Sequence, residues 1–249
     1  MIDTVSFYPV AIIAILIVGV SKSGFGGGVG VLAVPLMSLF IPPPQAAAIL
    51  LPLLIVMDWF TIWHYRKTWD KRNIVILLPA AMLGILLGSL FFKYLSEADI
   101  RILVGAIAVL FVANYFFKRR SVKPHQADVP RGLLWGSIAG FTSFGVHAGG
   151  PPINIYVLPQ QLDKTIFVGT TVIFFTVVNL VKVIPYTLLG QFSADNLLTS
   201  LILAPIAPLG VWLGVKLHHR VNEKLFYGLC YFFLLITGVK LLFDGVRGL

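Results

Sequence analysis

Long apolar runs are the feature that most constrains what this chain can fold into. A helix that crosses the hydrocarbon core of a bilayer needs about 20 mostly apolar residues. Runs of roughly that length cover residues 5–21, 46–65, 74–92, 102–117, 132–147, 165–189, 197–217 and 225–243. They predict an all-α polytopic membrane protein that crosses the lipid bilayer several times.

The composition excludes several other classes of protein. Of the 249 residues, 58% are hydrophobic and 12% are charged, whereas about a quarter of the residues of a soluble domain are charged. The mean hydropathy of +0.92 excludes a soluble globule and a disordered chain. The net charge of +9 does not indicate a nucleic-acid partner, because the cations occupy short gaps between apolar runs instead of one exposed face.

The positive charges predict the orientation of the chain. Lysine and arginine gather in the connections at 66–72, 118–131 and 216–224, whereas those at 42–45 and 190–196 carry no cation. Because cytoplasmic loops are enriched in lysine and arginine, we expect the first three connections to lie in the cytoplasm. Both termini then lie outside.

Two shorter apolar runs, at 29–41 and 151–159, each follow a glycine-rich break. Their 13 and 9 residues are too few to cross about 30 Å at about 1.5 Å per residue. We therefore expect two half-helices that meet their breaks near the middle of the membrane. Irregular backbone is tolerated at that depth only where protein buries it or water reaches it.

The two halves of the chain resemble each other. An offset of 121 residues aligns Gly19, Gly24, Gly28 and Asp58 with Gly140, Gly145, Gly149 and Asn179, and an offset of 126 aligns Pro79, Gly84, Gly88 and Glu97 with Pro205, Gly210, Gly214 and Glu223. This pattern predicts a duplication, with a first repeat at 1–117, a basic cytoplasmic linker at 118–131 and a second repeat at 132–249. Each repeat would hold four long helices and one half-helix, with the substrate site between the repeats.

The relative direction of the two repeats depends on the short runs. If these runs are re-entrant, eight spans result and both repeats point the same way. If each run completes a crossing, ten crossings result and the repeats are inverted. The charges favour inversion, because the connection at 66–72 is cationic whereas its counterpart at 190–196 is not.

The first glycine-rich break is a candidate anion site. Glycines sustain a helix poorly, and they let backbone N–H groups approach a ligand closely. The helix that follows would direct its positive N-terminal end at the same space. We therefore assign substrate binding to Lys22, Ser23, Gly24, Gly26, Gly27 and Gly28. The alternative for the glycines is close helix packing, since Gly24 and Gly28 have the Gly-x3-Gly spacing.

The second break is the counterpart of the first. Pro151 and Pro152 suit a first helical turn because they lack a backbone N–H, so this helix too would begin at its break. We assign substrate binding to His147, Ala148, Gly149, Gly150 and Asn154. His147 could donate to an anion or carry a coupled proton. The alternative is a histidine that simply bonds to a backbone carbonyl.

Ionisable residues at membrane depth are energetically costly and are therefore functional candidates. Asp58 is the candidate for proton coupling, and the alternative is that it pairs with Lys22 or His64 and only holds helices together. Asn179, its counterpart, and Lys182 are secondary polar candidates. For Lys182 we favour a side chain that snorkels to the membrane surface.

No catalytic or metal-binding pattern emerges. His218 and His219 are adjacent, so they do not face one ion from a helix. The single Cys230 allows neither a disulfide framework nor a thiolate metal site. The chain also lacks the phosphate-binding loop of an ATP-driven pump. We expect no enzyme, no cofactor and no metal.

The two breaks resemble those of the TauE/SafE family, also known as the 4-toluenesulfonate uptake permease family. The similarity rests on Gly-Phe-Gly-Gly-Gly-x-Gly after the first span, on Gly-x-x-Ala-Gly-Gly-Pro-Pro in the second break and on the cationic central connection, and it covers essentially the whole chain. It implies a transporter of the cytoplasmic membrane whose cargo is sulfite, sulfoacetate or another organosulfur anion, often exported. The glycine-rich stretches of the family fall on 22–30 and 145–152.

The residues and the resemblance together favour a secondary transporter. It would export a small sulfur-containing anion, such as sulfite, sulfoacetate or another organosulfonate, bound between the two breaks. Its partners would be this anion, the lipid bilayer and a coupled proton. The sequence does not decide whether the chain forms a homo-oligomer. A channel-like anion pore is the alternative, and a membrane assembly factor or enzyme is less favoured.

Overall fold

The computed structural model describes residues 6–27, 30–92, 94–117, 126–217 and 223–248. Every regular element in these residues is helical, which confirms the all-α prediction. The long helices are α1 (Phe7–Gly24), α3 (Pro43–Tyr65), α4 (Lys71–Phe92), α5 (Glu97–Phe117), α6 (Val129–Val146), α8 (Lys164–Leu188), α9 (Ala194–Leu203), α10 (Ile206–Leu217) and α11 (Glu223–Arg247). The short elements are η1 (Gly30–Leu32), α2 (Ala33–Met37), α7 (Gly150–Val157) and η2 (Leu158–Gln160).

One predicted span is broken by proline. The run at 197–217 forms two helices, α9 and α10, whose axes meet at 44°. Pro205 lies between them, and a proline has no N–H to donate and clashes with the preceding turn. Among the described residues, four helices (α1, α3, α4 and α8) are long and apolar enough to cross a membrane, and the bent pair makes up to five. By this criterion there are fewer spans than the eight or ten predicted crossings.

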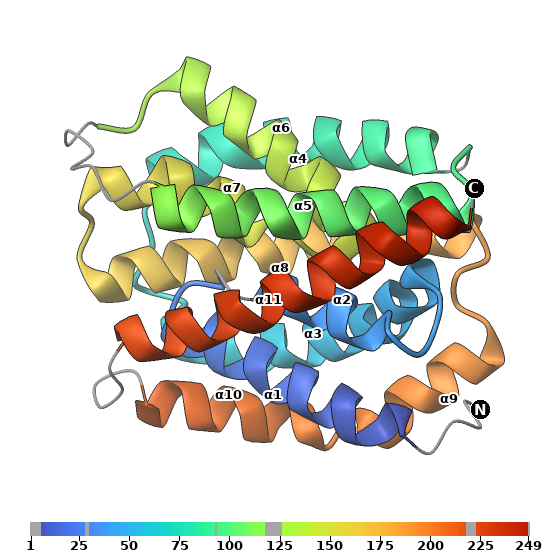
Figure 1. Cartoon of the computed structure of the whole chain (residues 1–249). Helices are drawn as coiled ribbons and strands as arrows, with labels where there is room; N and C mark the ends of the chain where they lie inside the picture. The colour runs from blue at the N-terminus through green and yellow to red at the C-terminus, as the bar shows by residue number, and fades with distance from the viewer. Residues whose placement is uncertain (1–5, 28–29, 93, 118–125, 218–222, 249) are drawn as a thin grey trace.

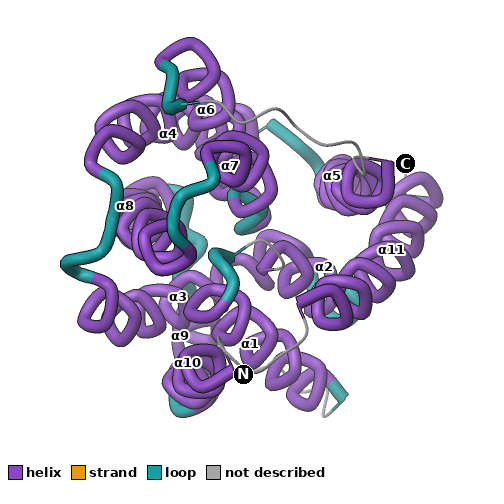
Figure 2. Tube along the Cα trace, turned by 90° about the vertical axis from the view of Figure 1, so that its left-hand side faces the viewer, coloured by secondary structure: helices purple, strands orange, loops and turns teal. Residues whose placement is uncertain are grey.

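The two short runs form short helices, as expected. The first gives the 3-10 turn η1 and the five residues of α2, and the second gives the eight residues of α7 followed by η2. At about 1.5 Å per residue, neither helix crosses a bilayer on its own. Both lie inside the bundle, where neighbouring helices cover them (Figure 2).

Helices α1 and α10 pack in parallel through small residues. Gly19 and Gly24 of α1 face Gly210 and Gly214 of α10, and a Cβ atom on Gly19 would lie 2.7 Å from the backbone of Gly210. Glycine lets two backbones approach this closely, as is common between membrane helices. The packing alternative considered for Gly24 from the sequence is therefore realised in the fold.

Helices α4 and α6 form a second parallel pair. Gly136 of α6 faces Ala80 of α4, and further along both helices Gly88 of α4 faces Phe144 of α6. A Cβ atom on Gly136 would lie 2.9 Å from the Cβ of Ala80. Small residues thus set the distance between helices in both parallel pairs.

Two other pairs of helices are antiparallel. Asp58 of α3 lies beside Asn179 of α8, whereas Tyr65, later in α3, packs against Val168, earlier in α8. Figure 1 shows that α5 and α11 also run in opposite directions. Viewed from the end of the bundle in Figure 2, α4, α6 and α7 lie on one side and α1, α9 and α10 on the other, with α3 and α8 between them.

The distribution of side chains is that of a protein in lipid. The outer surface carries large apolar side chains, among them Trp59 and Trp63 of α3, which are 77% and 74% exposed. The interior instead holds Lys22, Asp58 and Lys182. A soluble protein shows the opposite arrangement, with charged side chains almost never fully buried. The structure therefore supports a multi-pass membrane protein.

The described residues that flank the cation-rich connections lie at one end of the bundle (Figure 1). The α3–α4 connection, the start of α6 and the end of α10 are at the left in this view, whereas the start of α3 and the α8–α9 connection are at the right. This arrangement agrees with the charge pattern, which assigned the first group to one side of the membrane. The remaining cations of these connections, Lys118, Arg119, Arg120, Lys123 and Arg220, and the neighbouring His218 and His219 lie outside the described residues.

The close contact between α1 and α10 gives a stability prediction. We expect Gly19→Val to lower the free energy of unfolding by about 1–3 kcal/mol, because the added side chain forces two backbones apart. Titration of the protein with dodecyl sulfate in mixed micelles, followed by tryptophan fluorescence, measures this change. The control is Ile13→Phe on the same helix, where Ile13 is 54% exposed, and it should change stability by about 0.5 kcal/mol or less. Equal effects of the two substitutions would contradict the packing argument.

Candidate functional site

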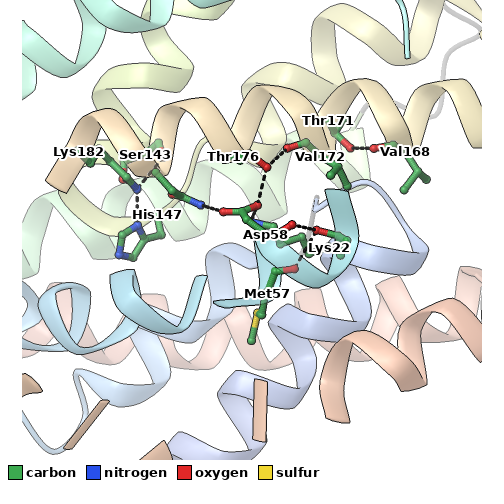
Figure 3. A network of polar contacts seen from close by, with 12 residues as sticks. Lys22, Met57, Asp58, Ser143, His147, Val168, Thr171, Val172, Thr176 and Lys182 are labelled. Carbon is green, nitrogen blue, oxygen red and sulfur yellow. Dashed lines mark hydrogen bonds and ion pairs between the residues drawn. The ribbon is translucent and has the colours of Figure 1, made fainter. Parts of the chain in front are cut away.

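A buried ion pair and its hydrogen-bond partners join the three helices α1, α3 and α8 (Figure 3). Lys22, in the last turn of α1, places its Nζ 2.6 Å from Oδ1 of Asp58 in α3, and both side chains are almost fully buried. Asn179 of α8 donates from Nδ2 to Oδ2 of Asp58 at 2.7 Å, and the hydroxyl of Thr176 lies 3.1 Å from Oδ1. We call these four residues the Asp58 cluster. Asp58 therefore pairs with Lys22 rather than with His64.

The energetics of this pair follow from its burial. Removing two charges from water carries a large desolvation cost, which close geometry and additional hydrogen bonds have to offset. Both oxygens of Asp58 have partners, so the carboxylate is satisfied as a buried charge must be. The same contacts hold the end of α1 against α3 and α8.

A second buried cluster lies one helical turn further along α8 (Figure 3). Nζ of Lys182 lies 2.9 Å from the carbonyl oxygen of Ser143, 3.1 Å from its hydroxyl and 2.6 Å from Nδ1 of His147. We call Ser143, His147 and Lys182 the Lys182 cluster. The prediction that Lys182 snorkels is wrong, because its side chain is fully buried and finds its hydrogen-bond acceptors on α6.

The hydrogen bonds of His147 define which of its nitrogens carries the proton. Nε2 lies 2.9 Å from the carbonyl oxygen of Ala47, and a carbonyl only accepts, so Nε2 donates. Nδ1 is then the acceptor for the amine of Lys182. The bond to a carbonyl is the alternative considered from the sequence, and it fixes the ring between α3 and α8.

The backbone at His147 is unusual for a residue with a side chain. His147 follows the last residue of α6 in the left-handed conformation, with φ 53° and ψ 29°, a position that glycine most often occupies. Its amide donates to the carbonyl of Ser143 at 3.1 Å, and the amide of Ala148 donates to that of Thr142 at 3.1 Å. Strained backbone of this kind is often found at functional sites.

The backbone conformation of the first break requires glycine at two positions. Gly26 and Gly27 adopt φ values of +70° and +77°, which residues with a Cβ rarely adopt. The chain can therefore turn sharply after α1. The amides of Phe25 and Gly27 both donate to the carbonyl of Ser21, at 3.0 and 2.9 Å. These two backbone donors are thus used inside the break.

A cavity of about 40 Å³ lies between the two breaks. It has room for a few water molecules or a small anion. The polar part of its wall comes from Lys22, Ser143, His147 and Asn179. The rest of the wall consists of Gly27, Gly30, Gly150, Val18, Leu50, Leu54 and Phe175. Both breaks, and both polar clusters, therefore meet at one space.

A larger pocket of about 470 Å³ lies toward the end of the bundle with the cation-poor connections. We call this pocket the vestibule; it is lined by Pro44, Ala47, Phe92, Leu95, Glu97, Ile100, Phe144, Gly145, Tyr186, Leu188, Leu189 and Gln191. Ala47 belongs to the vestibule and His147 to the cavity, so the hydrogen bond between them lies on the boundary. Tyr186 adds to this boundary, because its ring stacks on His147 at 6.3 Å between centroids and its hydroxyl donates to the carbonyl of Phe144 at 2.6 Å.

Some of the predicted site residues face away from the cavity. Ser23 directs its hydroxyl to the carbonyls of Gly19 and Val211, at 2.7 and 2.9 Å, and Gly24 faces Gly214. Both positions therefore hold α1 against α10. A Cβ atom on Gly26 would clash with the ring of Phe167, so this glycine also serves packing.

Some predicted site residues of the second break also serve packing rather than line the cavity. Gly149 is packed so closely that a Cβ atom would lie 2.9 Å from the carbonyl oxygen of Ala139. Ala148 is buried, and its carbonyl accepts a hydrogen bond from Thr142. Asn154 lies in α7, and in the described part of the chain its buried Oδ1 has no hydrogen-bond partner. Gly28 lies outside the described residues.

Sequence reasoning missed several residues of the site. Ser143, Thr176, Phe175 and Tyr186 were not singled out, although each contacts a cluster or lines a pocket. One signal was available for Ser143, which stands 121 residues after Lys22, the offset that relates Asn179 to Asp58. Tyr186 carries the same signal, since it stands 121 residues after Tyr65. Phe175 and Thr176 are ordinary residues of an apolar helix, and only the packing of α8 brings them to the site.

No group of three or more potential metal ligands occurs among the residues that the structure describes. The ionisable side chains of the site are two lysines, one carboxylate and one histidine, all buried. This arrangement suits the binding of an anion rather than of a metal ion, since it supplies hydrogen-bond donors and positive charge.

The chain is similar to a known family of proteins. A family model described as sulfite exporter TauE/SafE matches residues 11–241, which is nearly the whole chain. Neither the curated proteins nor the solved structures that were compared contain a match.

The Asp58 cluster gives a second stability prediction. We expect Lys22→Met to lower the free energy of unfolding by about 3–5 kcal/mol, because it leaves a buried carboxylate without its partner. The double variant Lys22→Met/Asp58→Leu should recover most of this loss, since no buried charge remains. Dodecyl sulfate titration in mixed micelles measures both.

The matched control for this experiment is Lys240→Met. Lys240 is 2.6 Å from Asp244, but its side chain is 52% exposed, so its removal should change stability by about 1 kcal/mol or less. A double variant that is less stable than Lys22→Met would show that burial of the charge is not the reason for the loss.

Proposed function

Since the chain belongs to the TauE/SafE family of sulfite exporters, we propose that it is a secondary transporter that exports a small sulfur-containing anion. Sulfite, sulfoacetate and other organosulfonates form the proposed substrate class. The observation that carries this proposal is the small cavity between the two breaks, whose wall includes Lys22 and His147. A lysine and a histidine on the wall of a buried cavity are the groups expected for an anion at membrane depth.

We assign anion binding to side chains more than to backbone donors. Lys22, His147 and Asn179 have their side chains on the cavity wall, and Gly27 and Gly150 leave room for a ligand there. The amides of Gly27 and Ala148 and Nε2 of His147 already have carbonyl acceptors, so Lys22, with three N–H donors, is the main donor for an anion. Ser23 and Gly24 would serve the site indirectly, by holding the end of α1 in place.

The two halves of the chain are proposed to be inverted repeats. Two hydrogen bonds recur at the offset of 121 residues: Tyr65 donates to the carbonyl of Ser23 at 2.8 Å, and Tyr186 donates to that of Phe144 at 2.6 Å. The antiparallel course of α3 and α8 supports inversion, since these two helices occupy the same position in the two halves.

The contact between Asp58 and Asn179 adds to this argument. These residues also stand 121 positions apart, and they bond directly to each other. A residue that touches its own counterpart lies on the axis that relates two repeats. The substrate site of a transporter with such repeats is expected at their interface, and the cavity borders on Asn179.

Asp58 is the proposed proton-coupling residue. Its carboxylate holds the amine of Lys22 at 2.6 Å, so an anion that binds Lys22 competes with Asp58. A proton on Asp58 removes this competition, and binding of the anion and the proton then favour each other. The loaded site would carry both across the membrane.

A carrier accounts for the pockets better than a channel-like pore does. The cavity and the vestibule have different linings, and the bond between His147 and Ala47 lies on the boundary between them. A channel needs one continuous path, whereas alternating access needs a barrier on each side of the substrate site in turn.

Transport by the purified protein tests the proposal. We expect proteoliposomes loaded with labelled sulfite to release it with a rate that saturates with concentration, as binding to a site requires. The double variant Lys22→Ala/His147→Ala should reduce this rate at least about tenfold, since it removes the Lys22 ammonium donor and the His147 ring from the cavity wall. Lys240→Ala, an exposed lysine, is the control and should leave the rate unchanged.

Two results would contradict this part of the proposal. Unchanged flux in the double variant would show that the anion binds elsewhere. Flux that never saturates would favour the pore.

The dependence of transport on pH tests the role of Asp58. We expect an acidic interior and an alkaline exterior to accelerate sulfite efflux in the wild type, because protonation of Asp58 frees Lys22 for the anion. Asp58→Asn should remove this acceleration, since an amide takes up no proton in this range. Both proteins are compared at the same pH values, so that protonation of sulfite itself cancels. An equal response of the two proteins would exclude Asp58 as the coupling residue.

A further inference from the structure

Lys182 is the buried cation that the mechanism above leaves unused. Its side chain is 0% exposed, and Nζ has three acceptors, namely the carbonyl and hydroxyl oxygens of Ser143 and Nδ1 of His147. An ammonium group has three N–H donors and no acceptor. The number of acceptors around Nζ therefore matches the charged form of the side chain.

The charges of the interior do not balance. Asp58 is the only carboxylate among the buried residues that the structure describes, and it is engaged by Lys22, Thr176 and Asn179. The described ion pairs give no carboxylate to Lys182. When Lys182 is protonated, its positive charge therefore has no carboxylate counter-ion among the described residues. Such a charge is costly inside a membrane, and its retention indicates a function.

The position of Lys182 connects this charge with the cavity. Ser143 and His147, which hold its ammonium group, both line the cavity, and so does Asn179 one turn earlier on α8. Figure 3 shows the Asp58 cluster and the Lys182 cluster following each other along α8. A ligand in the cavity would therefore lie beside Lys22 and be separated from Lys182 only by Ser143 and His147.

We infer that Lys182 sets the charge selectivity of the site, acting on the ligand through His147 and Ser143. Its unbalanced charge favours an anion over a neutral molecule of the same shape, whereas Lys22 on its own is neutralised by Asp58. Ser143, His147 and Lys182 are all buried, so the attraction between the ammonium group and an anion in the cavity is screened far less than at a protein surface. This inference rests on the proposed transport of an anion and names the residue that selects it.

Removal of the charge is the first arm of the test. Binding of sulfite and of dimethyl sulfone, a small neutral molecule that also carries oxygen atoms on sulfur, is measured by titration calorimetry on the full chain in detergent micelles. Lys182→Gln should weaken sulfite binding at least about tenfold and leave the affinity for the sulfone within about twofold. Lys182→Arg, which keeps the charge, should restore most of the affinity for sulfite. Lys240→Gln, at an exposed position, should change neither affinity.

Addition of a counter-ion is the second arm and keeps Lys182 in place. Ser143→Asp puts a carboxylate beside the ammonium group, since the Ser143 hydroxyl is 3.1 Å from Nζ. Ser143→Asn has the same shape and no charge. We expect the aspartate variant to bind sulfite at least about tenfold more weakly than the asparagine variant, with equal binding of the sulfone. This comparison tests the effect of the Lys182 charge on sulfite binding even if Lys182→Gln fails to fold.

The outcomes separate this inference from the proposed function. If Lys182→Gln, or Ser143→Asp relative to Ser143→Asn, weakens sulfite and the sulfone equally, Lys182 has only a structural role and the inference is wrong. If wild-type proteoliposomes transport sulfite and neither variant changes its affinity, the inference fails while the transport function stands. Absence of sulfite transport by the wild type would overturn both.

Discussion

The carboxylate of Asp58 is the contact on which the rest of the interior depends. It lies where α3 meets the last turn of α1 and the middle of α8, and its burial removes it from the bulk water that would stabilise its charge. Lys22 from α1 and the amide of Asn179 from α8 take the place of that water. Because the loss of either partner leaves an unsatisfied buried group, the three helices have one favourable arrangement. The first glycine-rich break, which follows Lys22, is positioned as a consequence.

Glycine serves two different purposes around this centre. At Gly19 and Gly24 the absence of a side chain allows α1 to lie directly on α10. At Gly26 and Gly27 it allows backbone angles with positive φ, so that the chain leaves α1 sharply and borders the cavity. Close packing therefore provides the rigid frame, and the turn provides the space for a ligand. The second break achieves a similar turn with His147 in the left-handed conformation.

The cavity and the vestibule are two separate spaces with different linings. Its cavity is small, and the hydrogen bond from His147 to Ala47 separates it from the vestibule. The same histidine accepts from Lys182, so movement at this boundary would also disturb the environment of the buried ammonium group. In the proposed transport cycle, binding of the anion and opening of the site would be linked through this side chain. Such a link between two contacts is what coupling between a ligand and a conformational change requires.

The sequence alone determined the helical class, the position of nearly every helix and the two short runs, because runs of about 20 apolar residues in lipid have few alternatives to a helix. It also identified Lys22, Asp58 and His147, since charged or polar residues stand out in such runs. Only the tertiary structure decided their partners. Nothing in the sequence distinguishes a lysine that reaches the membrane surface from one that turns inward, and Lys182 turns inward because α6 supplies its acceptors. The orientation of Ser23 and Gly24 toward α10 likewise depends on which helices become neighbours.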